Sequence, residues 1–199
     1  MIIADVVQGT TEWQAARCGI PTASNFGMII TCAGLPSKQA TKYMHRLAGE
    51  RVAGKAEESY QSASMLRGIE MEAEAAEWYE LSNDCEAQKA GLCYRDESKL
   101  YACSPDRLIG EDGLLEIKCP EIHTHVGYLL DNELPMDYFQ QIQGQLFVTG
   151  RKWADFMSYY PGIKPLIVRA YRDEKFLKAL HIELEKFCIE LENITRRIQ

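Results

Sequence analysis

Residues 103–120 read CSPDRLIGEDGLLEIKCP, and this stretch predicts the core of the fold. Asp106 ends one apolar run, a polar turn follows at residues 110–113, and a second apolar run carries Glu116 and Lys118. Side chains alternate across a strand, so Glu116 and Lys118 share one face and Ile117 points to the other. The glycine-rich turn brings the two strands side by side. We therefore expect Asp106 on the same face as Glu116 and Lys118.

Two carboxylates and one ammonium on adjacent strands predict a Mg²⁺ site for phosphodiester hydrolysis. Mg²⁺ takes oxygen ligands in octahedral geometry, and paired ions stabilise both the attacking and the leaving oxygen. We expect Asp106 to bridge two ions, and Glu116 with the main-chain carbonyl of Ile117 to complete one of them; Mn²⁺ is expected to substitute. Lys118 either helps deprotonate the attacking water, which requires a lowered pKa, or offsets developing charge. The alternative is an ordinary surface hairpin with a Glu–Lys pair.

The composition predicts one soluble domain spanning residues 1–199. A chain of 199 residues with 46% apolar content can bury one good core. Neither a signal peptide nor an apolar stretch of membrane-spanning length is visible, so we expect a cytoplasmic protein without a membrane partner. The seven cysteines form no C-x-x-C pair, which predicts reduced thiols rather than a zinc ribbon. The net charge of −7 disfavours an extended nucleic-acid-coating surface but allows a local basic channel.

The order of expected elements is typical of an α/β fold with a mixed central sheet flanked by helices. Strands are expected at residues 85–94, 100–108 and 114–119, as a meander, and at residues 153–160 and 166–171. Helices are expected from residue 10 or 11 to 17, from residue 21 onward as another short helix, and at residues 37–54, 62–81, 136–149 and 173–198. The last helix carries an apolar seam at three- and four-residue steps, and we expect it to pack on the sheet of its own chain rather than on a partner helix.

Several blocks of the sequence together resemble a known nuclease family. SPD at 104–106 and EIK at 116–118 match the P-D…(D/E)-x-K signature of the restriction-endonuclease-like superfamily. YACSPD at 101–106 and LEIKCP at 115–120 resemble the phage lambda exonuclease family and its viral recombinase relatives more narrowly. Further blocks occur in the family's order at residues 13–24, 67–72, 94–98 and 138–149. The resemblance therefore covers most of the chain and implies a restriction-endonuclease-like core.

The resemblance implies roles for five residues in catalysis. Asp106 and Glu116 are expected as metal ligands, and Lys118 as the catalytic lysine. Glu72 is expected to support the site from its helix, as a ligand through water or as a partner of Lys118. Gln141 is expected to project from a later helix and to hydrogen-bond water or substrate. For Glu72 and Gln141 the alternatives are a solvated helix carboxylate and a structural glutamine.

A second group of residues is expected to bind a DNA end. Arg17 and Ser24 are implied as ligands of a 5′-terminal phosphate, because arginine offers a bidentate fork and Ser24 lies near a helix start. Trp13, four residues before Arg17, either stacks on a terminal base or belongs to the core.

One block departs from the family pattern. After Pro120 the family has a phosphate-binding arginine, whereas residues 122–125 of this chain read IHTH. His123, Thr124 or His125 is expected to take that place, unless these are ordinary residues of a helix start. Separately, Lys38, Lys42 and Arg46 recur every four residues, and such a stripe either contacts duplex phosphates or is simply solvated.

The expected function is a Mg²⁺-dependent exonuclease that degrades one strand of linear double-stranded DNA from its 5′ end. The products are 5′-mononucleotides and 3′ single-stranded tails. The family implies a homotrimeric ring around DNA, a single-strand annealing recombinase as partner, and a phage or prophage origin in a bacterial host. Two alternatives remain: another nuclease of the superfamily (an endonuclease or a repair exonuclease), and a non-catalytic DNA-binding module.

Overall fold

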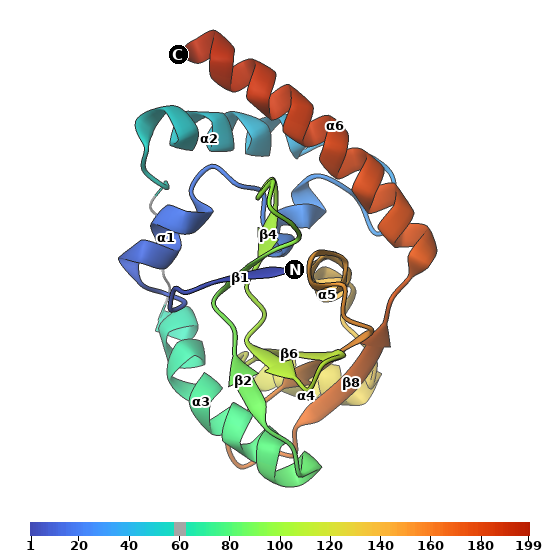
Figure 1. Ribbon diagram of the computed structural model, residues 1–199. Helices are drawn as coiled ribbons and strands as arrows, with labels where there is room; N and C mark the ends of the chain where they lie inside the picture. The colour runs from blue at the N-terminus through green and yellow to red at the C-terminus, as the bar shows by residue number, and fades with distance from the viewer. Residues whose placement is uncertain (58–62) are drawn as a thin grey trace.

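The computed structural model of the protein describes residues 1–57 and 63–199 (Figure 1). Its helices are α1 (Thr11–Arg17), the 3₁₀ helix η1 (Ala23–Met28), α2 (Ala40–Ala53), α3 (Ala63–Asn83), α4 (Ile122–Asp131), α5 (Met136–Thr149) and α6 (Glu174–Ile198). Its strands are β1 (Ile2–Ala4), β2 (Ala87–Lys89), β3 (Leu92–Tyr94), β4 (Ala102–Cys103), β5 (Arg107–Ile109), β6 (Gly113–Lys118), β7 (Trp153–Ser158) and β8 (Leu166–Tyr171).

The main sheet is mixed, which confirms the expected α/β class. Its strand order is β2-β5-β6-β7-β8. β6 and β7 run parallel, and the chain between them forms α4 and α5; the other neighbouring strands pair antiparallel. A parallel pair needs such a crossover, whereas the tight turn between β5 and β6 suffices for an antiparallel hairpin. The predicted hairpin around residues 110–113 is thereby confirmed.

Helices cover both faces of this sheet. On one face, Tyr79 of α3 belongs to the same apolar cluster as Ile117 and Met157 of the central strands. On the other face, Leu114 and Phe156 join a larger core with residues of η1, α2, α5 and α6. Glu116 and Lys118 lie two and four residues after Leu114 on β6. Their side chains therefore point to the same face of the sheet as Leu114, which is the face that α5 covers. Strand alternation thus directs the EIK segment toward one helix layer and Ile117 toward the other.

The predicted meander of three long strands is wrong in its details. The strand expected at residues 85–94 is divided into β2 and β3, and the one expected at 100–108 is divided into β4 and β5. The two halves belong to different sheets, because β3 pairs with β1 on one side and with β4 on the other in a second, three-stranded sheet. Gly91 marks the first division: a Cβ there would lie 2.2 Å from the carbonyl oxygen of Val6. The backbone passes too close to the N-terminal segment for any side chain.

Most helix predictions agree with the structure, with one corrected start. Thr10 caps α1 by accepting a hydrogen bond from the Trp13 amide, and Asp173 caps α6 through the Phe176 amide. α2 begins at Ala40 rather than residue 37, since the Ser37 hydroxyl accepts from the Gln39 amide in a turn before the helix. The start predicted for α3 at residue 62 lies outside the described residues. β1 had no counterpart among the predicted elements, and α4 corresponds only to the alternative of a helix start at residues 122–125.

The apolar seam of α6 packs within its own chain, but on helices rather than on the sheet. α6 lies beside α2 and also contacts α5 (Figure 1). Leu180, Leu184 and Leu191 are fully buried in the larger core, together with Leu47 of α2 and Leu146 of α5. The expected intrachain packing is confirmed, and the expected sheet contact is replaced by a helical layer.

All seven cysteines lie in described parts of the chain and have free thiols, three of them buried. This agrees with the expectation of reduced cysteines. Among the described helices, none combines the length and the apolar character that crossing a membrane requires.

Candidate active site

Asp106 and Glu116 lie together at the open end of the hairpin, away from its turn, as their positions in the sequence predict. Asp106 precedes β5 and is 7% exposed, and Glu116 on β6 is 2% exposed. The Asp106 carboxylate accepts a hydrogen bond from the Ile117 amide through Oδ2, at 2.7 Å. Within a strand the N–H and C=O of one residue leave on the same edge, so the Ile117 carbonyl also faces the edge of Asp106. Two carboxylates and one carbonyl are therefore available to a hard cation.

Burial and mutual repulsion raise the pKa of the Asp106 carboxyl. The largest cause is the removal of the carboxyl from water, followed among the raising causes by the negative charges of Glu116 and then Glu72. The positive charge of Lys118 and the hydrogen bond from the Ile117 amide lower the pKa and offset part of this rise. Two buried carboxylates side by side are costly unless a positive charge compensates them. Lys118 supplies one such charge.

Lys118 forms an ion pair with Glu116 across the face that they share. Its Nζ lies 2.5 Å from Oε1 of Glu116 and 5.5 Å from the centre of the Tyr138 ring. Burial by itself lowers the pKa of Lys118, but the charges of Glu116 and Asp106 outweigh it, and the net pKa is raised. The two carboxylates thus favour the charged form of Lys118, which compensates them in turn.

Two glutamines of α5 hold the Glu116 carboxylate from the other side. Gln141, which the sequence singles out, donates through Nε2 to Oε1. Gln145 donates through Nε2 to Oε2, at 2.6 Å, and is a residue that the sequence reasoning missed. The two are four residues apart, hence on one face of the helix. This four-residue spacing was the signal in the sequence that could have identified Gln145 as a neighbour of Gln141.

Glu72 of α3 approaches the site and pairs with Arg107 rather than with Lys118. Its Oε1 accepts from Nη1 of Arg107, at 2.8 Å, and the same Nη1 donates to the main-chain carbonyl of Asp106 at 2.7 Å. The ion partner of Lys118 is Glu116. Arg107, buried beside the carboxylates, therefore connects Glu72 to the segment that carries Asp106.

The candidate end-binding residues line the same pocket as the carboxylates. The pocket has a volume of about 250 Å³. Arg17, Ser24 and Trp13 line one part of it, and the remainder is formed by Asp106, Glu116, Lys118, Gln141, Gln145, Gln8, Thr22, Ala23 and Ser104. Residues about 90 positions apart in the sequence thus share one cavity.

Arg17 is held in place at the wall of this pocket. Its guanidinium carbon lies 4.3 Å from the centre of the Trp13 ring, and Nη2 donates to the Thr22 hydroxyl at 3.2 Å. The Trp13 indole N–H donates to the Ser104 hydroxyl at 2.9 Å, and the Ser24 hydroxyl lies 3.3 Å from that of Thr22. Burial lowers the pKa of Arg17, and the group remains a cation with donors available to an anion.

The remaining candidates lie away from this pocket. His123 is exposed on α4, and neither it nor Thr124 lines the cavity. His125 is buried: one ring nitrogen bonds the Ser158 hydroxyl at 2.7 Å, and the other donates to the Lys164 carbonyl at 3.1 Å. That histidine fastens α4 to the end of β7, and the structure brings no residue of 122–125 into the pocket.

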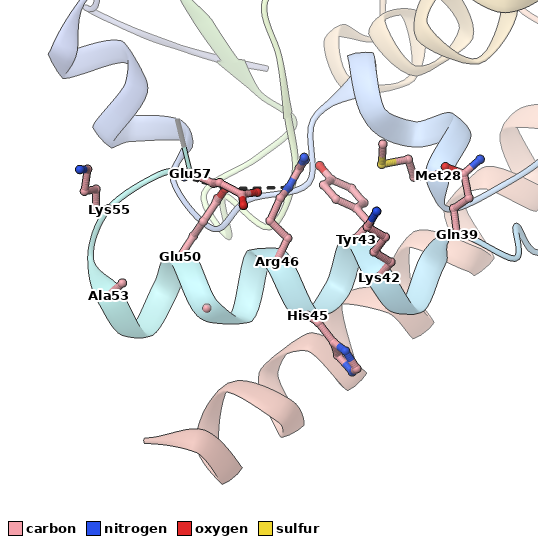
Figure 2. Close-up of a pocket in the computed structure, with 11 residues that line it drawn as sticks. Met28, Gln39, Lys42, Tyr43, His45, Arg46, Glu50, Ala53, Lys55 and Glu57 are labelled. Carbon is pink, nitrogen blue, oxygen red and sulfur yellow. Dashed lines mark hydrogen bonds and ion pairs between the residues drawn. The ribbon is translucent and has the colours of Figure 1, made fainter. Parts of the chain in front are cut away.

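A second cavity of about 660 Å³ lies along α2 (Figure 2). Lys42 and Arg46 line it, whereas exposed Lys38 precedes the helix and does not. Arg46 also lies 4.8 Å from the Tyr43 ring centre and 3.9 Å from Glu50, which partly offsets its charge. The Tyr43 hydroxyl accepts from the Thr22 amide at 3.2 Å, so α2 directly abuts the wall of the first pocket.

The residues of the first pocket fit a Mg²⁺ site with few protein ligands. No group of three or more His, Cys, Asp or Glu side chains suited to a metal occurs in the described residues. Mg²⁺ is commonly bound through one or two carboxylates, with water and substrate phosphate as the other ligands. Asp106 and Glu116, with the adjoining carbonyl, provide that donor set, and their repulsion is what a cation relieves.

Comparison with known proteins agrees with the geometry. Residues 12–152 match the family model described as the YqaJ-like viral recombinase domain. An alkaline exonuclease from Laribacter hongkongensis, LHK-Exo, is 32% identical over 95% of this chain and 96% of its own, with a TM-score of 0.86; a second structure of it, in complex with dAMP, matches equally.

A phage related exonuclease from Haemophilus somnus 129PT covers 90% of this chain and 96% of its own, at 13% identity and a TM-score of 0.70, and shares the fold. Among curated proteins, no sequence matches this chain. The family model spans well over half of the residues, and the exonuclease fold matches along almost the whole length. The chain therefore belongs to the YqaJ-like viral recombinase family, within the lambda exonuclease-like group that its motifs resemble.

Proposed function

We propose that this protein is a Mg²⁺-dependent exonuclease that degrades one strand of linear double-stranded DNA from its 5′ end. The observation that carries the proposal is the shared pocket: Arg17 and Ser24 lie in one cavity with Asp106, Glu116 and Lys118. A cation beside paired carboxylates suits binding of a terminal phosphate next to the bond to be cut. The relationship to an alkaline exonuclease at 32% identity supports the same activity.

In this proposal Asp106, Glu116 and the Ile117 carbonyl hold the metal. Two bound Mg²⁺ ions would supply Lewis-acid stabilisation and an activated water, and Mn²⁺ would replace them. Lys118, whose ammonium pairs with Glu116, would offset charge that develops at the scissile phosphate. Gln141 orients the Glu116 carboxylate, and Glu72 steadies the Asp106 segment through Arg107.

Arg17 and Ser24 would hold the 5′-terminal phosphate, with Trp13 against the terminal base. A pocket of about 250 Å³ is far too small for a duplex, which favours recognition of the end of a strand. The release of 5′-mononucleotides follows from this end recognition. The structure of LHK-Exo with dAMP, a nucleoside monophosphate, supports a product of this class.

The wider arrangement of the duplex rests on the family. We assign Lys42 and Arg46 to phosphate contacts beside the pocket, with Lys38 as an outer contact. A homotrimeric ring would enclose the DNA, and an annealing recombinase would receive the 3′ tail. A phage or prophage origin and action in the host cytoplasm fit the viral recombinase family. Static light scattering tests the ring: a mass of three chains of 22.6 kDa each is expected.

The decisive assay follows a linear duplex labelled at the 5′ or the 3′ end, with Mg²⁺ or with chelator. Labelled mononucleotide is expected to appear at once from the 5′ label, only late from the 3′ label, and not at all in chelator. A covalently closed circular duplex serves as the control and stays intact. Cleavage of the circle contradicts an exonuclease and indicates an endonuclease of the same superfamily.

The site assignment is tested by Asp106→Ala. Loss of one of two carboxylate ligands is expected to abolish hydrolysis, while the variant still binds duplex DNA in chelator, because Arg17 and the α2 cations remain. Band shift and digestion are measured on the same preparation. Undiminished digestion by the folded variant refutes the role given to Asp106, and a loss of binding alone points to misfolding.

A further inference from the structure

Gln145 stands out among the pocket residues because it is almost completely buried yet only half satisfied. It lies on α5, lines the pocket, and is 1% exposed. Its Nε2 donates to Glu116, while its Oε1 is buried without a hydrogen-bond partner among the described residues. Buried side-chain acceptors in native proteins nearly always have a partner. A missing partner inside a ligand pocket indicates a donor that arrives with the ligand.

The two oxygens of Glu116 have different surroundings. Oε1 accepts from Lys118 and Gln141, both of which are partly exposed to the pocket. Oε2 accepts from Gln145, on the buried side. Oε1 is thus held by two donors at the pocket, whereas Oε2 is fixed by a group that cannot move without disturbing the core.

We propose that Gln145 is a positioning residue of the site: it anchors Glu116 through Oε2, so that the carboxylate keeps its place for a metal, and through its own Oε1 it accepts a hydrogen bond from a donor that arrives with the ligand. Groups that orient a metal ligand through its second atom fix the geometry on which affinity depends. On this proposal the hydrogen bonds of the Gln145 side chain are complete only when the pocket holds a ligand. The inference rests on the proposed function, because it concerns the glutamate of that same site.

Gln143 provides a matched control on the same helix. It is also buried and makes two hydrogen bonds, donating to the Tyr171 carbonyl and accepting from the Asp173 amide. These bonds fasten α5 to the start of α6 and do not involve Glu116. Replacement of Gln143 and of Gln145 by methionine therefore removes a buried amide of equal size, with and without contact to the site.

The experiment measures Mg²⁺ binding by titration calorimetry without DNA, and kcat and KM on a 5′-phosphorylated duplex. Gln145→Met is expected to weaken Mg²⁺ binding and to lower kcat, each about 10–100-fold, the usual range for losing such a partner, with KM for the duplex nearly unchanged. Gln143→Met is expected to keep the parent's kcat and Mg²⁺ affinity. If Gln145→Met does not fold, Gln145→Asn takes its place: it keeps the amide but is one methylene too short to reach Glu116, and the same losses are expected.

The outcomes separate this inference from the proposed function. A folded Gln145→Met or Gln145→Asn protein with the parent's Mg²⁺ affinity and kcat overturns the inference. Equal losses in Gln143→Met also overturn it, since they indicate a general effect on α5. A parent protein that digests no DNA overturns the proposed function instead, and the Mg²⁺ titrations of the variants still decide the role of Gln145.

Discussion

Arg17 carries the expected preference for a phosphorylated DNA end. We expect the parent protein to digest a 5′-phosphorylated duplex faster than a 5′-hydroxyl duplex, and Arg17→Ala to remove the difference. A hydrogen bond to a charged group contributes about 1.5–3 kcal/mol, which corresponds to roughly 10–100-fold in kcat/KM. Initial rates on the two duplexes, for both proteins, give the comparison.

Arg197 supplies the control for that substitution. It is an exposed arginine in the last turn of α6, outside both cavities. Arg197→Ala removes the same charge from the protein and is expected to preserve the preference. Equal rates on the two duplexes in the parent protein refute the end-binding role of Arg17.

Asp106 is expected to destabilise the metal-free protein. Its carboxylate is buried beside that of Glu116, and both burial and this neighbour raise its pKa. Asp106→Asn removes the charge while an amide oxygen remains to accept from the Ile117 N–H. We expect its Tm in chelator to exceed that of the parent by about 2–4 °C, the shift that 1 kcal/mol produces in a domain of this size.

The pH dependence of this expected gain in Tm follows from the direction in which the pKa of Asp106 is shifted. A carboxyl with a raised folded-state pKa binds protons more tightly in the folded protein. The parent's stability from this group is therefore present at low pH and declines as pH rises from the ordinary value of about 3.9 through the folded pKa. The advantage of Asp106→Asn should be small in acid and grow toward neutral pH. A constant difference, or a lower Tm for the variant throughout, contradicts the assignment.

Single residues of the site were predictable where one strand decides their direction. Alternation along β6 suffices to place Glu116 and Lys118 together. It does not say which amides reach Glu116, because α5 has four glutamines, at 140, 141, 143 and 145, and only two of them contact that carboxylate. Which glutamine reaches Glu116 depends on the rotation of α5 about its own axis. That rotation is fixed by the packing of α5 against η1.

The close contact of α5 with η1 depends on Gly144. A Cβ at Gly144 would lie 2.5 Å from Cδ2 of Phe26 and 3.2 Å from Cβ of Ala23. Phe26 is fully buried and has no space to turn aside. Gly144→Ala is expected to lower the free energy of unfolding by about 1–3 kcal/mol, the usual cost of overpacking a core. Urea unfolding followed by circular dichroism measures it.

The same substitution should also affect the end-binding side of the site. η1 carries Ser24, so a displaced η1 moves Ser24 relative to Gln141 of α5, and the preference for a 5′-phosphate is expected to fall. Gly127→Ala in α4 is the control: its added Cβ meets nothing within 4 Å. It is expected to stabilise the protein by about 0.5–1 kcal/mol, the usual difference between the two residues in a helix. Unchanged stability of Gly144→Ala refutes the tight contact.

The sheet boundaries were less predictable than the helices for a physical reason. Apolar residues recur through 85–94 and 100–108, so a local pattern predicts two uninterrupted strands. The interruptions come from distant parts of the chain: β1 lies antiparallel to β3, and the main chain near Val6 leaves no room beside Gly91. A pairing with the N-terminus is not visible in the strands themselves.

The molecule as a whole places the site between two layers. The main sheet carries Asp106, Glu116 and Lys118, and the segment from α1 to η1 carries Trp13, Arg17 and Ser24. α2 supports that segment through Tyr43, and α6 lies on α2 (Figure 1). The apolar seam predicted α6 as a packing helix but not its partner, because a seam records which face is buried and not against what.

The α2–α6 contact is expected to contribute to stability without contributing to chemistry. Leu184 is 0% exposed in the core beneath α6, whereas Ile189 on the same helix is 66% exposed. Leu184→Ala is expected to lower the free energy of unfolding by about 2–5 kcal/mol yet to keep the parent's kcat well below its Tm, since Leu184 lines neither cavity. Ile189→Ala should leave both quantities nearly unchanged. Equal losses of stability in the two variants indicate that α6 packs differently from the structure.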